Sequence, residues 1–305
     1  MFVPPRKQST FYVLTTLEGS ILPKIWRRVL YTMLLSAAVN YSHGHLWDIK
    51  IMPTPALFTV MGLTLAIFLG FRNTVSYDRF WEGRKLWGQL MIDARSFARE
   101  CMMFAPQVST QELRYRIYLM IAFVYTLKHH VRGTSPYEDL RPLLWPRDVE
   151  KIMAANNRPN MVLHMLGQML GEWRKNGIEP QYLARMEMTL DSLSVVQGGC
   201  ERILSTPIPH PYLLLLHRTV HVYCFLLPFA LTDSIGILTP LVVGMVSYTF
   251  FGLDAIGEEI ANPFEAQEHD LPLDAMSRTI EINLREQMGE TDLPSSVEPR
   301  DRVLT

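Results

Sequence analysis

A run of 17 residues without a charged side chain, 55–71, constrains the fold of this chain more than any other feature. At about 1.5 Å per residue, a helix over this run spans about 25 Å, most of the roughly 30 Å hydrocarbon core of a bilayer. The first ionisable group after it, Arg72, stands where lipid headgroups are expected. The run therefore predicts a membrane-spanning helix, with membrane lipid as a partner.

Three further apolar stretches occupy residues 25–43, 212–231 and 235–253, and the last of them carries no charge. A short connection joins 25–43 to 55–71, and another joins 212–231 to 235–253. In a soluble protein all four would be buried core helices, but uncharged stretches of this length are uncommon in soluble folds. We therefore predict four crossings in two hairpins.

The distribution of Lys and Arg predicts the orientation of these hairpins. Lys50 is the one Lys or Arg in the first hairpin loop, about 43–54, and the second loop, about 232–234, has none. Basic residues instead flank the opposite ends of the first hairpin: Arg6, Lys7, Lys24, Arg27, Arg28, Arg72, Arg79, Arg84 and Lys85. Because Lys and Arg concentrate on the cytoplasmic side of a membrane, both termini and the long middle segment are predicted to be cytoplasmic.

The rest of the chain reads as helical. Apolar residues recur at helical spacing beyond 72, so the second crossing is expected to continue into the cytoplasmic segment. No alternation of period two lasts long enough to predict a sheet, and the final residues look extended or disordered. Prolines separate the further helices that we expect, near 110–131, 147–155, 159–174, 180–204, 254–260 and 272–288.

Composition excludes several classes of protein. Lys and Arg number 29 against 30 Asp and Glu, so the net charge of −1 gives no reason to expect nucleic acid as a partner. The three widely spaced cysteines form no disulfide framework or zinc pattern and are expected to be inert core residues. The usual catalytic and nucleotide-binding fingerprints are missing, so we expect no enzyme and no cofactor.

Several polar side chains are candidate sites. His217 and His221 share a helix face at ligand-compatible spacing, but no third metal ligand is positioned, so polar packing is favoured over a metal or an enzyme site. An arginine in a bilayer is costly, so Arg218 should face a partner, an aqueous cavity or headgroups. The pair His129–His130 most resembles a solvated helix end.

The second crossing carries a stripe of apolar side chains at i, i+4 and i+8: Leu63, Ile67 and Phe71, called here the neck stripe. Gly62 and Gly70 lie off the stripe and would let neighbouring helices approach closely. Several copies around an axis would form an apolar constriction that gates by wetting and dewetting. From spacing alone, packing against other crossings or lipid is the favoured alternative.

Three long blocks make the chain resemble a known family. GLTLAIFLGFRNTVSYDRFWEGRKLWGQL (62–90), SVVQGGCERILSTPIPHPYLLLLHRTV (194–220) and DAIGEEIANPFEAQEHDLPLDAM (254–276) resemble the bestrophins, above all their prokaryotic branch and the related plant thylakoid chloride channels. The resemblance implies an all-α membrane protein assembled as a homopentamer around one axial pore, in the bacterial inner membrane. The neck stripe falls on the family's pore neck, so the resemblance favours a pore-lining role for it over packing or lipid contact.

The apolar runs divide the chain into an N-terminal segment 1–24, a first hairpin 25–71, a cytoplasmic segment 72–211, a second hairpin 212–253 and C-terminal helices 254–305. The resemblance implies that the cytoplasmic segment encloses a vestibule. It places the vestibule's second constriction near Gln181, where other members carry an aliphatic residue. The acidic run that holds Ca²⁺ in eukaryotic members is degenerate here (Asn262, Glu265, Glu268 and Asp270), so we predict no calcium gating and no bound metal.

The resulting expectation is a passive channel for small monovalent ions, Na⁺/K⁺ or Cl⁻. Cation conduction is slightly favoured because the match is to the bacterial branch, whose members include cation-selective channels, while the eukaryotic and plant branches conduct anions. The alternative from another class is a membrane-anchored scaffold or sensor, whose cytoplasmic helices bind a partner.

Overall fold

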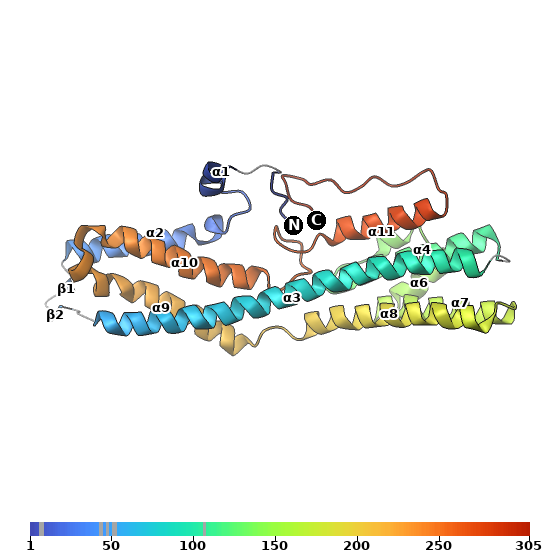
Figure 1. The fold of residues 1–305 in the computed structure, drawn as a ribbon, viewed down its shortest axis with the longest axis horizontal. Helices are drawn as coiled ribbons and strands as arrows, with labels where there is room; N and C mark the ends of the chain where they lie inside the picture. The colour runs from blue at the N-terminus through green and yellow to red at the C-terminus, as the bar shows by residue number, and fades with distance from the viewer. Residues whose placement is uncertain (6–8, 43–44, 47–48, 51–53, 106–107) are drawn as a thin grey trace. The chain divides into compact units, whose positions relative to one another are not determined.

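The computed structural model describes residues 1–5, 9–42, 45–46, 49–50, 54–105 and 108–305. Within them the chain forms two compact units: Met1–Val3, Trp81–Thr206 and Pro263–Thr305 make one, called here the charged unit, while Pro4–Phe80 and Pro207–Asn262 make the other, called the apolar unit. Helix α3 (Pro55–Phe104) contributes to both units (Figure 1). Its continuity over the apolar run and the residues beyond it was expected from the uninterrupted helical spacing.

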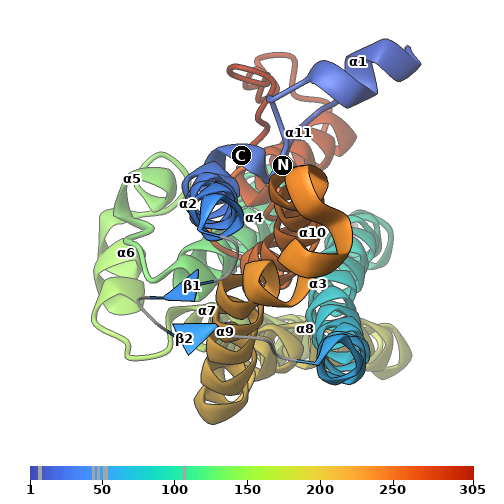
Figure 2. The same ribbon diagram turned by 90° about the vertical axis from the view of Figure 1, so that its left-hand side faces the viewer.

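The apolar unit is a bundle of α2 (Leu22–Tyr41), the first half of α3, α9 (His210–Ile235) and α10 (Thr239–Glu259), with the short α1 (Thr10–Thr15) near its start. Figure 2 views these helices nearly end-on. They share one core, made by residues such as Ile25, Leu69, Cys224 and Phe251. The four apolar stretches thus form four helices, as the sequence predicts.

Local sequence explains where the helices of the second hairpin begin and end. The segment 206–209 is not helical, and α9 begins at His210 with a proline in its first turn, a position where the missing N–H costs nothing. A single 3₁₀ turn, η1 (Gly236–Leu238), separates α9 from α10. Among the described residues, two helical stretches, Ala56–Phe104 and His210–Glu259, are long and apolar enough to cross a membrane.

The charged unit contains the second half of α3 and six further helices: α4 (Thr110–Arg132), α5 (Tyr137–Leu140), α6 (Pro146–Met153), α7 (Arg158–Lys175), α8 (Pro180–Ser205) and α11 (Leu273–Gln287). The predicted helices of this segment are confirmed within a few residues. One prediction was wrong, because residues 254–260 form the end of α10 in the apolar unit and no separate helix. The described strands β1 (His45–Leu46) and β2 (Ile49–Lys50) pair antiparallel in the first hairpin loop.

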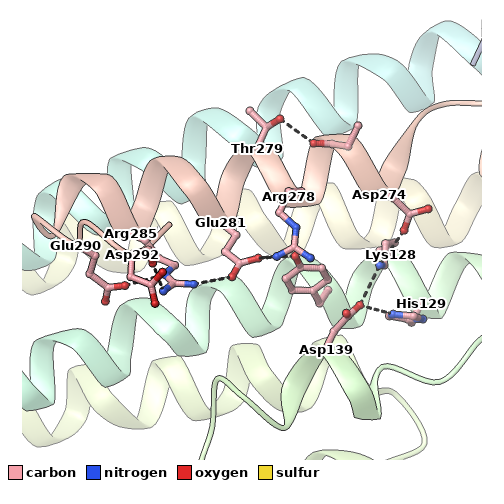
Figure 3. A network of polar contacts seen from close by, with 12 residues as sticks. Lys128, His129, Asp139, Asp274, Arg278, Thr279, Glu281, Arg285, Glu290 and Asp292 are labelled. Carbon is pink, nitrogen blue, oxygen red and sulfur yellow. Dashed lines mark hydrogen bonds and ion pairs between the residues drawn. The ribbon is translucent and has the colours of Figure 1, made fainter. Parts of the chain in front are cut away.

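Polar contacts fasten α11 onto α4 in the charged unit (Figure 3). The buried Lys128 ammonium lies 3.0 Å from Asp139 and 2.9 Å from Asp274. Burial alone would raise the pKa of Asp139, but hydrogen bonds from His129 and Lys128 outweigh it and lower that pKa to about 2. His129 and His130 stand in the last turn of α4, so the predicted helix end is confirmed, but His129 is not simply solvated, because its ring bonds both Thr134 and Asp139.

A second part of the same network centres on Glu281 of α11, which is 4% exposed. It accepts a hydrogen bond from the Tyr125 hydroxyl at 2.6 Å and ion-pairs with Arg278 at 2.7 Å. A buried carboxylate is tolerated when it is paired and hydrogen-bonded in this way. Residues 288–305, after α11, form turns and irregular chain without a further helix, and the Arg302 carbonyl accepts from the Val3 amide at 2.8 Å.

Candidate functional site

The neck stripe lies on the outer face of α3 in the apolar unit. Leu63, Ile67 and Phe71 are 63%, 49% and 61% exposed. The buried positions of the same helix, Phe58, Leu65 and Leu69, fall on the opposite side at about 100° per residue. Within one chain the neck stripe therefore does not pack against the other crossings, which removes one of the two alternatives considered from spacing.

The two glycines beside the stripe differ in role. A Cβ at Gly62 would lie 2.7 Å from the Tyr223 hydroxyl of α9, so this glycine permits a close approach of α3 and α9. A Cβ at Gly70 would meet no atom of the described residues within 4 Å, so they show no close approach at this position.

Directly after the neck stripe, α3 buries a charge. The Arg72 guanidinium forms an ion pair with the Asp254 carboxylate of α10, and the two side chains are 3% and 1% exposed. The second carboxylate oxygen of Asp254 lies 2.8 Å from Nδ1 of His217 on α9. Arg72, which the sequence predicts at the level of the headgroups, thus points into the bundle and joins α3, α9 and α10 through one buried carboxylate.

Sequence reasoning missed Asp254 as a partner. The available signal was an acidic residue near the end of the fourth apolar stretch, opposite in charge to the arginine that ends the second. Arg72 directly follows the uncharged run 55–71, and Asp254 directly follows the uncharged run 235–253. Neither residue therefore has an opposite charge within the run that it ends. A charged residue at the end of one apolar helix thus predicts an opposite charge on a neighbouring apolar helix, because a buried charge needs a counter-charge.

Beyond this ion pair, α3 and α10 stay close to one another. The Ser76 hydroxyl donates to the Gly257 carbonyl at 2.8 Å. A Cβ at position 257 would lie 2.2 Å from Oδ1 of Asn73, so only glycine allows this approach without rearrangement. On the neighbouring helix, Lys24 of α2 lies 2.6 Å from Glu259 at the end of α10.

The other predicted site residues lie on α8 and α9. Gln181 is exposed in the first turn of α8 and its side-chain amide donates to the Glu179 carboxylate. His221 bonds the His217 carbonyl through Nδ1 at 2.7 Å, and their rings are 4.3 Å apart. Arg218 is exposed on α9. The structure brings the two histidines together with Asp254.

The degenerate acidic segment folds into turns after α10. Asp270 is buried and one of its carboxylate oxygens accepts from the Gln267 amide at 2.7 Å, while the Gln267 side chain donates to Glu265 at 2.7 Å. Glu268 is exposed, and Asn262 is the last residue of the apolar unit, whereas Pro263 begins the next segment of the charged unit. In the described part of the chain, no three His, Cys, Asp or Glu side chains are grouped so as to hold a metal ion.

The three cysteines are buried thiols, as expected for core residues. Burial raises the pKa of Cys200, in the charged unit, to about 12. At neutral pH such a thiol is protonated and a poor nucleophile.

Comparisons with known proteins agree with one another. Residues 1–286 match the family model described as Bacterial/Fungal Bestrophin protein. The voltage-dependent anion channel-forming protein YneE of Escherichia coli is 39% identical over 283 residues, 92% of each chain. The voltage-dependent anion channel-forming protein RSc3414 of Ralstonia nicotianae is 36% identical over 296 residues, covering 96% of this chain and 97% of the relative.

A solved structure extends the likeness to the fold. The crystal structure of a bacterial bestrophin homologue from Klebsiella pneumoniae superposes with a TM-score of 0.84 at 39% identity, covering 87% of this chain and 99% of that one. The match covers helices of both units. The chain therefore belongs to the bestrophin family, in the branch found in bacteria and fungi, and has its helical membrane-protein fold.

Proposed function

We propose that this protein is a passive ion channel, without catalytic activity, in which copies of the chain surround one axial pore. The observation that carries the proposal is the neck stripe, an apolar face of α3 that no other part of the described chain covers. The chain's membership of the bestrophin family also supports the proposal, since its relatives are named channel-forming proteins. Five copies form the assembly, as the resemblance to bestrophins implies.

The four apolar helices cross the bacterial inner membrane in two hairpins, with both termini in the cytoplasm. The proposed divisions are 1–24, 25–71, 72–211, 212–253 and 254–305, so that the charged helices between the hairpins enclose a vestibule. The membrane family and the two long apolar stretches support this arrangement, as does the predominance of Lys and Arg at the cytoplasmic ends.

The neck stripe acts as the gate. A ring of apolar side chains around a narrow passage disfavours water and hence hydrated ions, so conduction requires the passage to wet. Gln181, exposed at the start of α8, lines a less hydrophobic second constriction. The channel conducts without calcium. The acidic segment after α10 lacks a continuous run of aspartates, and its Asp270 carboxylate already accepts a hydrogen bond from the Gln267 backbone N–H.

The choice of ion is the point on which sequence and relatives differ. Resemblance to the bacterial branch slightly favoured cations, whereas the relatives from Escherichia coli and Ralstonia are named for anion channels, which supports the alternative of a chloride channel. Apolar neck side chains by themselves select neither sign. The selectivity therefore depends on charged groups outside the neck stripe.

Substitution of the middle residue of the neck stripe tests the gate. Ile67→Ala widens the passage and should raise single-channel conductance in a planar bilayer by about twofold or more, since the barrier is apolar. Leu241→Ala removes a similarly exposed aliphatic side chain of α10 and is the matched control, with conductance expected to stay at the wild-type value. Equal currents in all three proteins would place the gate elsewhere, and no current from any of them would favour the membrane-anchored scaffold.

A further inference from the structure

Three charged residues lie on α3 within the apolar unit: Arg72, Asp78 and Arg79. The two arginines are both occupied on the bundle side of the helix. Arg72 is buried against Asp254, and Nε of Arg79 donates to the Ala261 carbonyl at 3.0 Å. Neither guanidinium is therefore on the face that carries the neck stripe.

Asp78 has the opposite surroundings. Its side chain is exposed, and within the described residues it forms no ion pair or hydrogen bond. It follows Phe71 by seven residues, which is two helical turns less about 20°, so it lies on the face of the neck stripe. The rise along the helix between the two residues is about 10 Å.

We infer that Asp78 is a selectivity-determining residue, placed at the cytoplasmic end of the neck. This inference rests on the proposed function, because it takes the neck stripe to line the pore. Rotational symmetry then turns one carboxylate into a ring, and a ring of Asp or Glu attracts cations and repels anions. Between Phe71 and Asp78 the same face of α3 carries Thr74 and no charge, so Asp78 is the first charge that an ion meets on this face after leaving the neck.

The burial of Arg72 is part of the argument. From the sequence, Arg72 is the first charge after the apolar run, and an exposed ring of arginines would favour anions. The ion pair with Asp254 withdraws that positive charge from the pore face and neutralises it. The charge left facing the pore is then negative.

Reversal potentials test the inference. Purified wild type, Asp78→Asn and Glu258→Gln are compared in a planar bilayer under a tenfold NaCl gradient; Glu258 is an exposed carboxylate near the end of α10 and is the matched control. Asp78→Asn should shift the reversal potential toward that of chloride, with the cation-to-anion permeability ratio falling about fivefold. Glu258→Gln should leave the ratio unchanged.

Ionic strength separates an electrostatic role from a structural one. The difference between wild type and Asp78→Asn should shrink between about 0.1 M and about 1 M salt, because the Debye length falls from about 10 Å to about 3 Å. Asp78→Lys should shift the ratio further in the same direction. Currents from Asp78→Asn that reverse at the wild-type potential would overturn the inference, whereas an absence of current from the wild type would overturn the channel itself.

Discussion

Replacing Asp254 with asparagine removes the counter-charge of a buried arginine while preserving the shape of the side chain. Arg72 stays in place with 3% of its side chain exposed, and its Nε already lacks a hydrogen-bond partner among the residues that the structure describes. His217 also loses the carboxylate that its Nδ1 contacts at 2.8 Å. The variant therefore leaves a buried charge unpaired in the middle of the apolar unit.

The magnitude follows from burial. Breaking one partner out of a fully buried ion pair costs about 3–5 kcal/mol, because the remaining charge keeps its desolvation penalty. The half-exposed contact with His217 adds about 1 kcal/mol at most. We expect Asp254→Asn to lower the free energy of unfolding by about 3–5 kcal/mol, and His217→Ala by about 1 kcal/mol or less.

The assay is equilibrium unfolding of the purified protein in detergent, followed by tryptophan fluorescence. The matched control is the double variant Arg72→Met/Asp254→Leu, which removes both charges and fills the same space; apolar replacement of a buried pair is often neutral or stabilising. We expect it to recover most of the loss. A single variant within about 0.5 kcal/mol of wild type, or a double variant as unstable as the single one, would refute the reasoning, since both follow from an uncompensated charge.

Three further predictions concern other contacts. Gly257→Ala should destabilise the protein by about 1–3 kcal/mol in the same unfolding assay, because its Cβ would lie 2.2 Å from Oδ1 of Asn73. Adding Asn73→Ala removes that oxygen and should restore stability. A double variant as unstable as Gly257→Ala would contradict the steric cause. The pKa of Asp139 is lowered from 3.8 to about 2, so it stabilises the fold above about pH 4, and this contribution of about 2 kcal/mol is lost as the pH falls through 2. Asp139→Asn should abolish that part of the acid sensitivity, and an unchanged pH profile would count against it. Chelation of calcium should leave the bilayer currents of the purified channel unchanged. Loss of current on chelation would show that calcium bound to the segment near Asp270 still gates the channel.

The positions of the helices were predictable because local signals mark them. Apolar spacing and prolines locate α8 within a residue of the expected range, and the uncharged run and its continuation predict the long α3. These signals act over a few residues. The pairing of α11 with α4 through Lys128 and Asp274, 146 residues apart, has no such signal, so neither that network nor the place of His129 in it was predicted.

The candidate site divides in the same way. Its apolar face was predictable, since three side chains at four-residue spacing share one face whatever surrounds the helix. The burial of Arg72 was not predictable, because it depends on an ion pair with Asp254, 182 residues further along the chain. Spacing predicted that a charge follows the apolar run, but only tertiary structure shows that this charge is buried and paired.

Helix phase nevertheless connects the two charges in a way that local reasoning allows. Arg72 and Asp78 are six residues apart, so about 120° of rotation separates them on α3. If the neck stripe faces an axis, Asp78 shares that face and Arg72 does not, whatever the partner of Arg72 is. The nearest charge along the sequence is therefore a poor guide to the charge that an ion meets. If the neck stripe lines the pore, as we propose, its apolar side chains select neither sign, and the first exposed charge in phase with them decides; on this helix that charge is a carboxylate.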